Sequence, residues 1–333
     1  MINPFKYADP SLRGLRTSFL FFRFSDEFLP RVNMSNAPSW FKTKAPQLAL
    51  ILITMIWGGS FLTVQYGLNF ASPMFFVGCR FAAAMLFVCL FSWKDLSGIN
   101  LKEIAAGALI GLVIAIGYGT QTIGLKTISS SESAFLTALY VPLVPILLWL
   151  LFRKTPQIMT WCGAGLAFLG LVFLTGNGFG QIQLNFGQII TILGSIAIAL
   201  EIILIGFFAG KVNVRRVTVI QLGFASIFAF CMMPVASETW NPSFSWPLII
   251  ILCGLGLASA AIQLVMNWAQ REVSPSQAAI IYSGEPVWAA LIGRIAGERL
   301  PLLAILGGVL VVLGVIVSEW KPKFLKKNKE VNP

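Results

Sequence analysis

Ten stretches of mostly apolar residues occupy this chain between Gln47 and Ser318. A transmembrane helix needs about 20 such residues, because each adds 1.5 Å of rise across a hydrocarbon core of about 30 Å. The pattern predicts an all-α integral membrane protein with ten transmembrane helices. The predicted spans are residues 47–67, 73–93, 104–123, 133–151, 158–175, 186–208, 217–235, 246–268, 277–295 and 302–318.

Composition excludes a water-soluble globule. Of the 333 residues, 57% are hydrophobic and 11% charged, against roughly 25% charged in a soluble domain. The net charge of +11 does not predict a nucleic-acid partner, because the cations lie in loops and tails between apolar spans and do not share one face.

The chain also lacks the usual residues of an enzyme or a metal site. Histidine, the commonest general base and zinc ligand, is absent. The five cysteines lie inside spans at no metal-ligand spacing and are interpreted as small buried apolar residues. No phosphate-binding G-x-x-x-x-G-K-[ST] motif occurs. We therefore expect no catalytic residues, no metal, no cofactor and no ATP-driven step.

Lysine and arginine predict the orientation, because cytoplasmic loops carry an excess of both. With a cytoplasmic N-terminus and ten spans, the C-terminus is cytoplasmic too, and the predicted outer loops hold only Lys126 and Arg299. The predicted inner segments hold Lys6, Arg13, Arg16, Arg23, Arg31, Lys42, Lys44, Lys94, Lys102, Arg153, Lys154, Lys211, Arg215, Arg216, Arg271 and the tail lysines from Lys321 to Lys329. A multi-pass protein of the inner cell membrane is expected.

The last five spans echo the first five. At an offset of 144 residues, Pro142 matches Pro286, and Gly163 and Gly170 match Gly307 and Gly314. At an offset of 141, Arg80 matches Gln221, with a weaker alignment around it. Because each half has an odd number of spans, the second half enters the membrane from the opposite side. This predicts inverted repeats with a site at their interface, near the middle of the bilayer.

Several stretches resemble the drug/metabolite transporter superfamily, EamA type. They are IWGGSF (56–61), SPMFFVGCRF (72–81), GLKTISSSESAFLTALYVPLVP (124–145) and WAQREVSPSQAAIIYSGEPVWAALIG (268–293). The resemblance implies two EamA-type repeats, residues 47–175 and 186–319, and secondary transport of small metabolites, often as export. The second repeat carries the family's GERLP at 297–301, but the first has RKTPQ at 153–157 and lacks the acid. The resemblance therefore gives Glu298 no symmetric role.

The segments outside the repeats are predicted to be cytoplasmic tails, residues 1–46 and the basic residues 320–333. A second methionine, Met34, stands shortly before the first span. Residues 1–33 are thus either a cytoplasmic tail or the product of a misplaced start, and both alternatives remain open.

Charged residues inside spans are costly, about 2.5–3.5 kcal/mol each at the bilayer centre on insertion scales. Glu285 is the candidate for proton coupling, and Arg80 for substrate binding; an internal ion pair between helices is the structural alternative for both. Arg294, near a span end, is expected to reach the membrane edge, and the same interpretation applies to Glu201, which lies nearer the inner half of its span.

Polar and aromatic residues deep in the spans complete a predicted substrate pathway, because a mixed lining suits an amphiphilic metabolite. Gln121 is set aside as a hydrogen-bonding residue of a helix end. Pro142 and Pro286 remove a backbone donor in mid-span, as a kink or as a hinge. The pathway consists of Trp57, Arg80, Tyr118, Tyr140, Gln221, Gln263, Asn267 and Tyr282.

The sequence thus predicts a secondary active transporter that works by alternating access. The resemblance adds export of small amphiphilic metabolites, such as amino acids or drugs, in exchange for protons. An uncoupled facilitator, a non-transporting scaffold and an intramembrane enzyme remain as alternatives. The expected partners are the lipid bilayer, a small-molecule substrate and protons. Substrate, direction, coupling ion and oligomeric state are not determined by the sequence.

Overall fold

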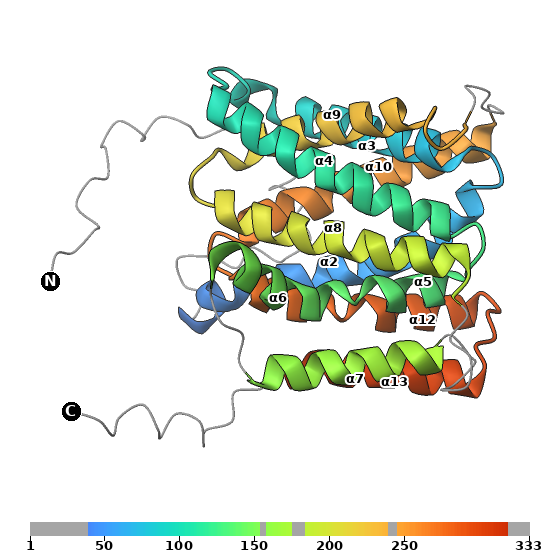
Figure 1. The fold of residues 1–333 in the computed structure, drawn as a ribbon. Coiled ribbons are helices and arrows are strands. Elements are labelled where there is room, and N and C mark those ends of the chain that lie inside the picture. Colours follow the sequence, from blue (N-terminus) through green and yellow to red (C-terminus); the bar gives the residue numbers. More distant parts are fainter. Residues whose placement is uncertain (1–38, 154–157, 175–183, 239–244, 319–333) are drawn as a thin grey trace, which may run out of the picture. The chain divides into compact units, whose positions relative to one another are not determined.

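The chain forms helices throughout the part described by this computed structural model, which comprises residues 39–153, 158–174, 184–238 and 245–318. The described residues from Thr43 onwards belong to one compact unit, and the description below concerns this unit. The tails 1–38 and 319–333, the segment 154–157 and the Gly176–Gly180 run lie outside the described residues. The helices (Figure 1) are α2 (Ser39–Gly67), α3 (Pro73–Ser92), η2 (Trp93–Asp95), α4 (Leu101–Gly124), α5 (Ser130–Thr137), α6 (Tyr140–Phe152), α7 (Ile158–Leu174), α8 (Phe186–Phe208), α9 (Val214–Met232), α10 (Trp246–Ala269), α11 (Pro275–Tyr282), α12 (Glu285–Ile295) and α13 (Leu302–Ser318).

Seven described segments are long and apolar enough to cross a membrane. They include α5 and α6 taken together as residues Ser130–Phe152, and a shorter apolar stretch, Ile305–Gly314, lies in α13. The prediction of ten spans is therefore confirmed only in part. The three remaining segments are short: α7 and α13 have 17 residues each, and α11 and α12 are separate helices of 8 and 11 residues.

The fourth and ninth predicted spans are not continuous helices, and proline explains both breaks. Proline has no amide hydrogen, and its ring clashes with the carbonyl four residues earlier. For Pro142 that carbonyl belongs to Ala138, between α5 and α6; for Pro286 it belongs to Tyr282, the last residue of α11. Each proline lies in the first turn of the second helix of its pair, so both halves are broken at the same place.

The two halves meet through α7 and α13, which pack side by side (Figure 1). A methyl group on Gly170 would lie 2.6 Å from the carbonyl oxygen of Gly307, and one on Gly314 would lie 2.6 Å from that of Gly163. Gly170 therefore faces Gly307 while Gly163 faces Gly314, so the two helices are antiparallel. Reciprocal contacts between matching positions are the signature of a two-fold axis, and glycine lets the backbones approach this closely.

Helices of the two halves alternate in the rest of the unit. In Figure 1, α4 packs on α8 and α9, α3 packs on α9 and α10, and α6 packs on α8. The largest side chains without solvent exposure, Trp57, Tyr140 and Tyr282, therefore lie where the halves meet. The core is thus shared between the halves.

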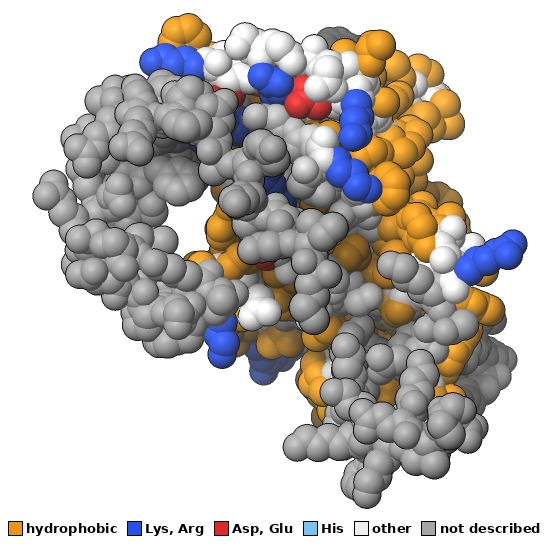
Figure 2. All heavy atoms as spheres, turned by 90° about the vertical axis from the view of Figure 1, so that its left-hand side faces the viewer, with side chains coloured by type: hydrophobic (Ala, Val, Ile, Leu, Met, Phe, Trp, Pro, Cys, Tyr) orange, Lys and Arg blue, Asp and Glu red, His pale blue; other side chains and the backbone are white. Residues whose placement is uncertain are grey.

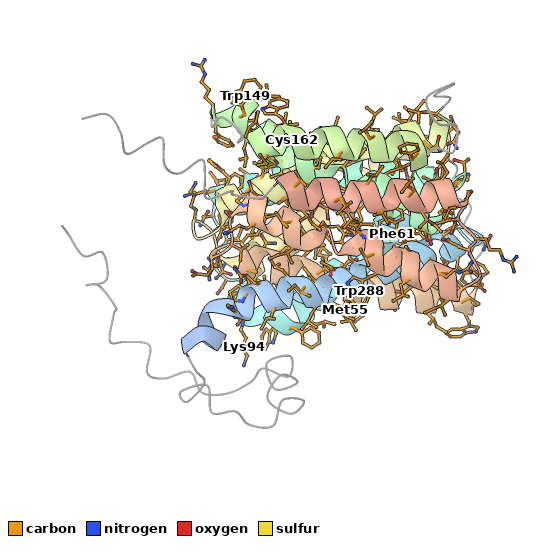
Figure 3. All side chains as sticks on the ribbon, turned by 90° about the horizontal axis from the view of Figure 1, so that it is seen from below. Met55, Phe61, Lys94, Trp149, Cys162 and Trp288 are labelled. Carbon is orange, nitrogen blue, oxygen red and sulfur yellow. The ribbon has the colours of Figure 1, made fainter. Side chains whose placement is uncertain are left out.

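Apolar side chains also cover the outside of the helices, as with the labelled Met55 and Trp149 in Figure 3. Soluble proteins rarely expose continuous apolar patches of this extent, so this surface faces hydrocarbon. Cys162, Cys231 and Cys253 are exposed on it. Their predicted burial was wrong, because an apolar helix in lipid has a lipid-facing side that periodicity does not reveal.

Ionic contacts hold the end at which α3 passes into α4. Asp95 pairs with Arg215, and Arg216 Nη1 lies 3.5 Å from Glu103 Oε2. Figure 2 shows charged side chains at this end of the unit beside hydrophobic ones. At the end where α2 passes into α3, the Glu238 carboxylate accepts a hydrogen bond from the Met74 amide at 3.0 Å. The connections that follow α3 and α9 thus each hold the start of a neighbouring helix.

Candidate functional site

All nine residues predicted for the pathway and for proton coupling are buried, at most 5% exposed. They come from α2, α3, α4, α6, α9, α10, α11 and α12, so both halves contribute. Buried polar groups require hydrogen-bond or charge partners, and the partners that they have define the site.

Aromatic rings form its centre. Trp57 on α2 stacks on Tyr118 of α4, with ring centroids 6.0 Å apart and 5° between planes. Trp57 also meets Tyr282 of α11 edge-to-face at 5.8 Å. The Trp57 Nε1 group has no hydrogen-bond partner among the described residues, so an indole donor is available at the centre of the stack.

Arg80 lies beside this stack. Its Nε donates to Ser259 Oγ of α10 at 2.7 Å, and its Cζ lies 5.3 Å from the Tyr118 ring centroid. A cation over an aromatic face gains roughly 0.5–2 kcal/mol, more when it is desolvated. Within the described residues, no ion pair joins Arg80 to Glu285 or to any other acid. Ser259 was missed by the sequence analysis, since a serine among apolar residues carries no distinctive signal.

Glu285 is the first residue of α12 and has no solvent exposure. Its Oε2 accepts a hydrogen bond from the Tyr140 hydroxyl at 3.2 Å, while Oε1 has no partner among the described residues. A helix start favours a negative charge. Gly58 of α2 admits the close approach of this turn, since a methyl group there would lie 2.7 Å from the Glu285 carbonyl oxygen.

Three amides form a hydrogen-bonded chain in the second half. Asn267 Nδ2 donates to Gln221 Oε1 at 3.2 Å, Gln221 Nε2 donates to Gln263 Oε1 at 2.7 Å, and Gln263 Nε2 donates to Glu201 Oε1 at 2.7 Å. Glu201 has no solvent exposure, so its assignment to a membrane edge was wrong. Its place on α8 faces the interior, a property that counting along the span could not supply.

Two further residues considered, Arg294 and Gln121, both lie near helix ends. Arg294 is exposed near the end of α12. Gln121 lies in the last turn of α4 and donates to Thr137 of α5 at 3.1 Å. No group of three or more Cys, Asp or Glu within the described residues could hold a metal ion.

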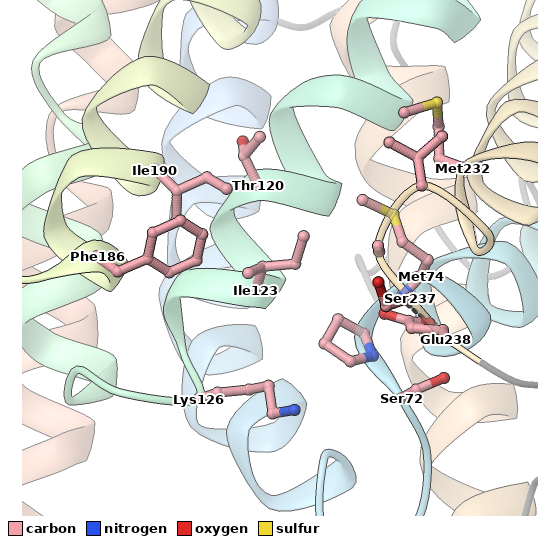
Figure 4. A pocket seen from close by; sticks show the side chains of 13 residues that line it. Ser72, Met74, Thr120, Ile123, Lys126, Phe186, Ile190, Met232, Ser237 and Glu238 are labelled. Atoms are coloured by element: carbon pink, nitrogen blue, oxygen red, sulfur yellow. Dashed lines mark hydrogen bonds between the residues drawn. The ribbon is translucent and has the colours of Figure 1, made fainter.

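A pocket of about 760 Å³ opens at the end where α2 passes into α3 (Figure 4). It contains none of the nine predicted residues, which pack against one another elsewhere. Lys126 and Glu238 are its charged residues. The complete lining is Ser72, Pro73, Met74, Thr120, Ile123, Lys126, Phe186, Ile190, Met232, Val235, Ala236, Ser237 and Glu238.

Comparison with known proteins adds four findings. The EamA-like transporter family matches residues 45–176 and again 185–320. An uncharacterized transporter of Archaeoglobus fulgidus is 31% identical over 81% of this chain and 84% of its own. The uncharacterized inner membrane transporter YedA of Escherichia coli K12 is 28% identical over 84% of this chain and 92% of its own. A solved crystal structure matches with a TM-score of 0.61 and 15% identity over 87% of this chain and 99% of its own, which shows a shared fold.

Proposed function

Since this chain belongs to the EamA-like transporter family, and is therefore a multi-pass membrane transporter, we propose that it exports small amphiphilic metabolites in exchange for protons. The observation that carries the proposal is the buried cluster around Trp57, where a guanidinium, a carboxyl group and aromatic faces meet between the two halves. Such a lining binds a molecule with both apolar and charged parts. The cost of burying these charges in a membrane favours a functional role.

The proposed architecture is ten spans in two inverted repeats, 47–175 and 186–319. The reciprocal glycine contacts of α7 and α13 and the matching helix breaks support it. Alternating access follows if the two halves exchange conformations around the shared site. Pro142 and Pro286 are the proposed hinges, because broken helices bend with little loss of backbone hydrogen bonding.

The proposed topology places the protein in the inner membrane, with both termini in the cytoplasm. Lys94, Arg215 and Arg216 lie at the end that this topology assigns to the cytoplasm. Alkaline phosphatase fused after Gly178 should be active, and the same enzyme fused after Lys323 should be inactive. Activity after Lys323 would overturn the ten-span count.

Glu285 is the proposed carrier of the coupling proton. Its buried carboxyl group has one oxygen without a partner and no cation at ion-pair distance within the described residues. The ionised form of such a group is costly, by several kcal/mol. Arg80, which has no acid at ion-pair distance in the described part of the chain, is available to an anionic group of the substrate or to Glu285 at another stage of the cycle.

Purified protein in liposomes tests the proposal with a panel of labelled amphiphilic metabolites, with and without an imposed pH gradient. We expect accumulation to depend on the gradient. We expect Glu285→Gln to abolish gradient-driven accumulation while substrate exchange persists. Glu272→Gln, which changes an exposed acid, is the matched control.

The alternatives give different results in the same assay. An uncoupled facilitator would equilibrate the metabolite without responding to the gradient. A scaffold would move no member of the panel. An unchanged pH dependence in Glu285→Gln would make this carboxyl group structural.

A further inference from the structure

The amide chain of the second half has one direction. Asn267, Gln221 and Gln263 each donate towards the next member, and the last donor reaches the carboxyl group of Glu201. Aligned hydrogen bonds polarise one another, so the two bonds between the amides strengthen the last one, from Gln263 to Glu201 Oε1. The second oxygen of Glu201, Oε2, has no partner among the described residues.

The charge balance of the buried cluster involves two acids and one cation. Glu201 and Glu285 are both fully buried, Arg80 is the buried guanidinium, and no ion pair joins Arg80 to either acid within the described part of the chain. An unpaired buried carboxylate costs several kcal/mol. Two ionised carboxylates in one desolvated cluster would also repel each other. The cluster is therefore stable only if at least one acid carries a proton.

The titratable groups near Glu201 come from several other helices. Tyr118 on α4, Tyr282 on α11 and Glu285 on α12 lie within its electrostatic range, and Tyr140 on α6 bonds to Glu285. Tyrosine hydroxyls are neutral at physiological pH. The charge that varies around Glu201 is therefore that of Glu285.

The far end of the amide chain lies at the end where α9 begins. Asn267 Nδ2 also donates to Thr218 Oγ1 at 3.2 Å, and the Thr218 hydroxyl donates to the carbonyl oxygen of Val214, the first residue of α9, at 2.6 Å. Arg215 and Arg216 follow directly and pair with Asp95 and Glu103. A row of polar side chains thus lies between Glu201 and the start of α9, and its hydrogen bonds point away from Asn267 in both directions.

We propose that Glu201 is a second proton-binding residue, which exchanges its proton with water that enters from the charged end of α9 past the polar side chains of Thr218, Asn267, Gln221 and Gln263. The proton binds Oε2, while Oε1 keeps its hydrogen bond from Gln263. Water at the charged end supplies the proton and takes it back, so the step changes charge only at Glu201. As a step of transport, this proposal rests on the proposed function, and it adds a proton site distinct from Glu285.

Infrared spectroscopy tests the site without transport, on purified protein in lipid membranes. A pH-difference spectrum detects the C=O stretch of a protonated carboxyl group. We expect Glu201→Gln to remove one band and Glu285→Gln to remove a different one. The same loss in a second variant, Glu201→Leu, and a shifted band in Glu201→Asp guard against misfolding. A spectrum that Glu201→Gln leaves unchanged would overturn the proposal.

The path is tested by deuterium exchange of the Glu201 band. Gln263→Leu replaces the polar side chain beside Glu201 by an apolar one, which hinders the approach of water, so the band should exchange more slowly than in the unmodified protein. Gln121→Leu is the matched control, because Gln121 is a buried, hydrogen-bonded amide outside the chain, and it should leave the rate unchanged. Equal rates in both variants would refute the path. If the band titrates but transport ignores the pH gradient, the proton site stands and the proposed coupling fails.

Discussion

Two glycines of α7 provide a direct test of how the halves are held together. A methyl group on Gly170 would lie 2.6 Å from the Gly307 carbonyl oxygen and 2.7 Å from the Val311 nitrogen of α13, whereas one on Gly165 meets nothing within 4 Å. Both substitutions to alanine gain the same helix preference, about 1 kcal/mol. The difference between the two variants therefore isolates the cost of the contact.

The geometry sets the size of that cost. A carbon atom rests at about 3.3–3.6 Å from a carbonyl oxygen, so α7 and α13 must separate by roughly 0.7–1 Å to admit the methyl group of Gly170→Ala. A gap of 0.5–1 Å forfeits about a quarter to a half of each dispersion contact, and overpacking costs about 1–3 kcal/mol. The free energy of unfolding of Gly170→Ala should therefore be about 1–3 kcal/mol lower than that of Gly165→Ala.

The assay is reversible unfolding in mixed micelles of a mild detergent and dodecyl sulfate. By the two-fold relation, Gly314→Ala should lose as much stability as Gly170→Ala. The double variant should lose less than the sum, because helices already separated by one methyl group accommodate the second more easily. Equal free energies for Gly170→Ala and Gly165→Ala, within about 0.5 kcal/mol, the usual additivity error, would refute the close packing.

Three further predictions address other contacts. Glu298 accepts four hydrogen bonds from the amides and hydroxyls of the first two residues of α5, so Glu298→Gln should lower the free energy of unfolding by about 1–2 kcal/mol, whereas Glu272→Gln, at an exposed acid, should change it little; equal effects would contradict the contact. Tyr140→Phe removes the hydrogen bond to Glu285 and should lower the same free energy by about 1–3 kcal/mol, because a buried acceptor loses its donor; an unchanged value would show that the bond contributes nothing. Protein started at Met34 should insert and transport normally, since two lysines still precede the first span; lost membrane expression or transport would show that residues 1–33 are required.

Sequence periodicity located the helices because a membrane imposes their length and composition. The predicted ends of α8, residues 186 and 208, agree with the observed helix, since lipid requires an uninterrupted apolar stretch with polar residues beyond it. The repeat was also visible, because Gly170 and Gly314 must stay small wherever two helices touch. The broken helices α11 and α12, by contrast, were predicted as one span; proline indicated a disturbance but not a complete separation.

The site was predicted residue by residue but not in its contacts. Depth along a span indicated that Trp57, Tyr282 and Glu285 lie far from water. Depth does not encode the rotation of a helix about its axis or the identity of its neighbour, so it could not reveal that Arg80 contacts Ser259 and Tyr118.

The sequence by itself determined that this chain spans a membrane, that it is duplicated and that its apolar spans contain charges, because each of these properties is local or repeats along the chain. Only the tertiary structure decided which charges meet. Glu201 illustrates the difference: its neighbours in sequence are apolar, and its partner Gln263 lies 62 residues away on α10. Contacts between distant helices depend on how α8 and α10 are rotated and packed, and that packing is a property of the assembled bundle.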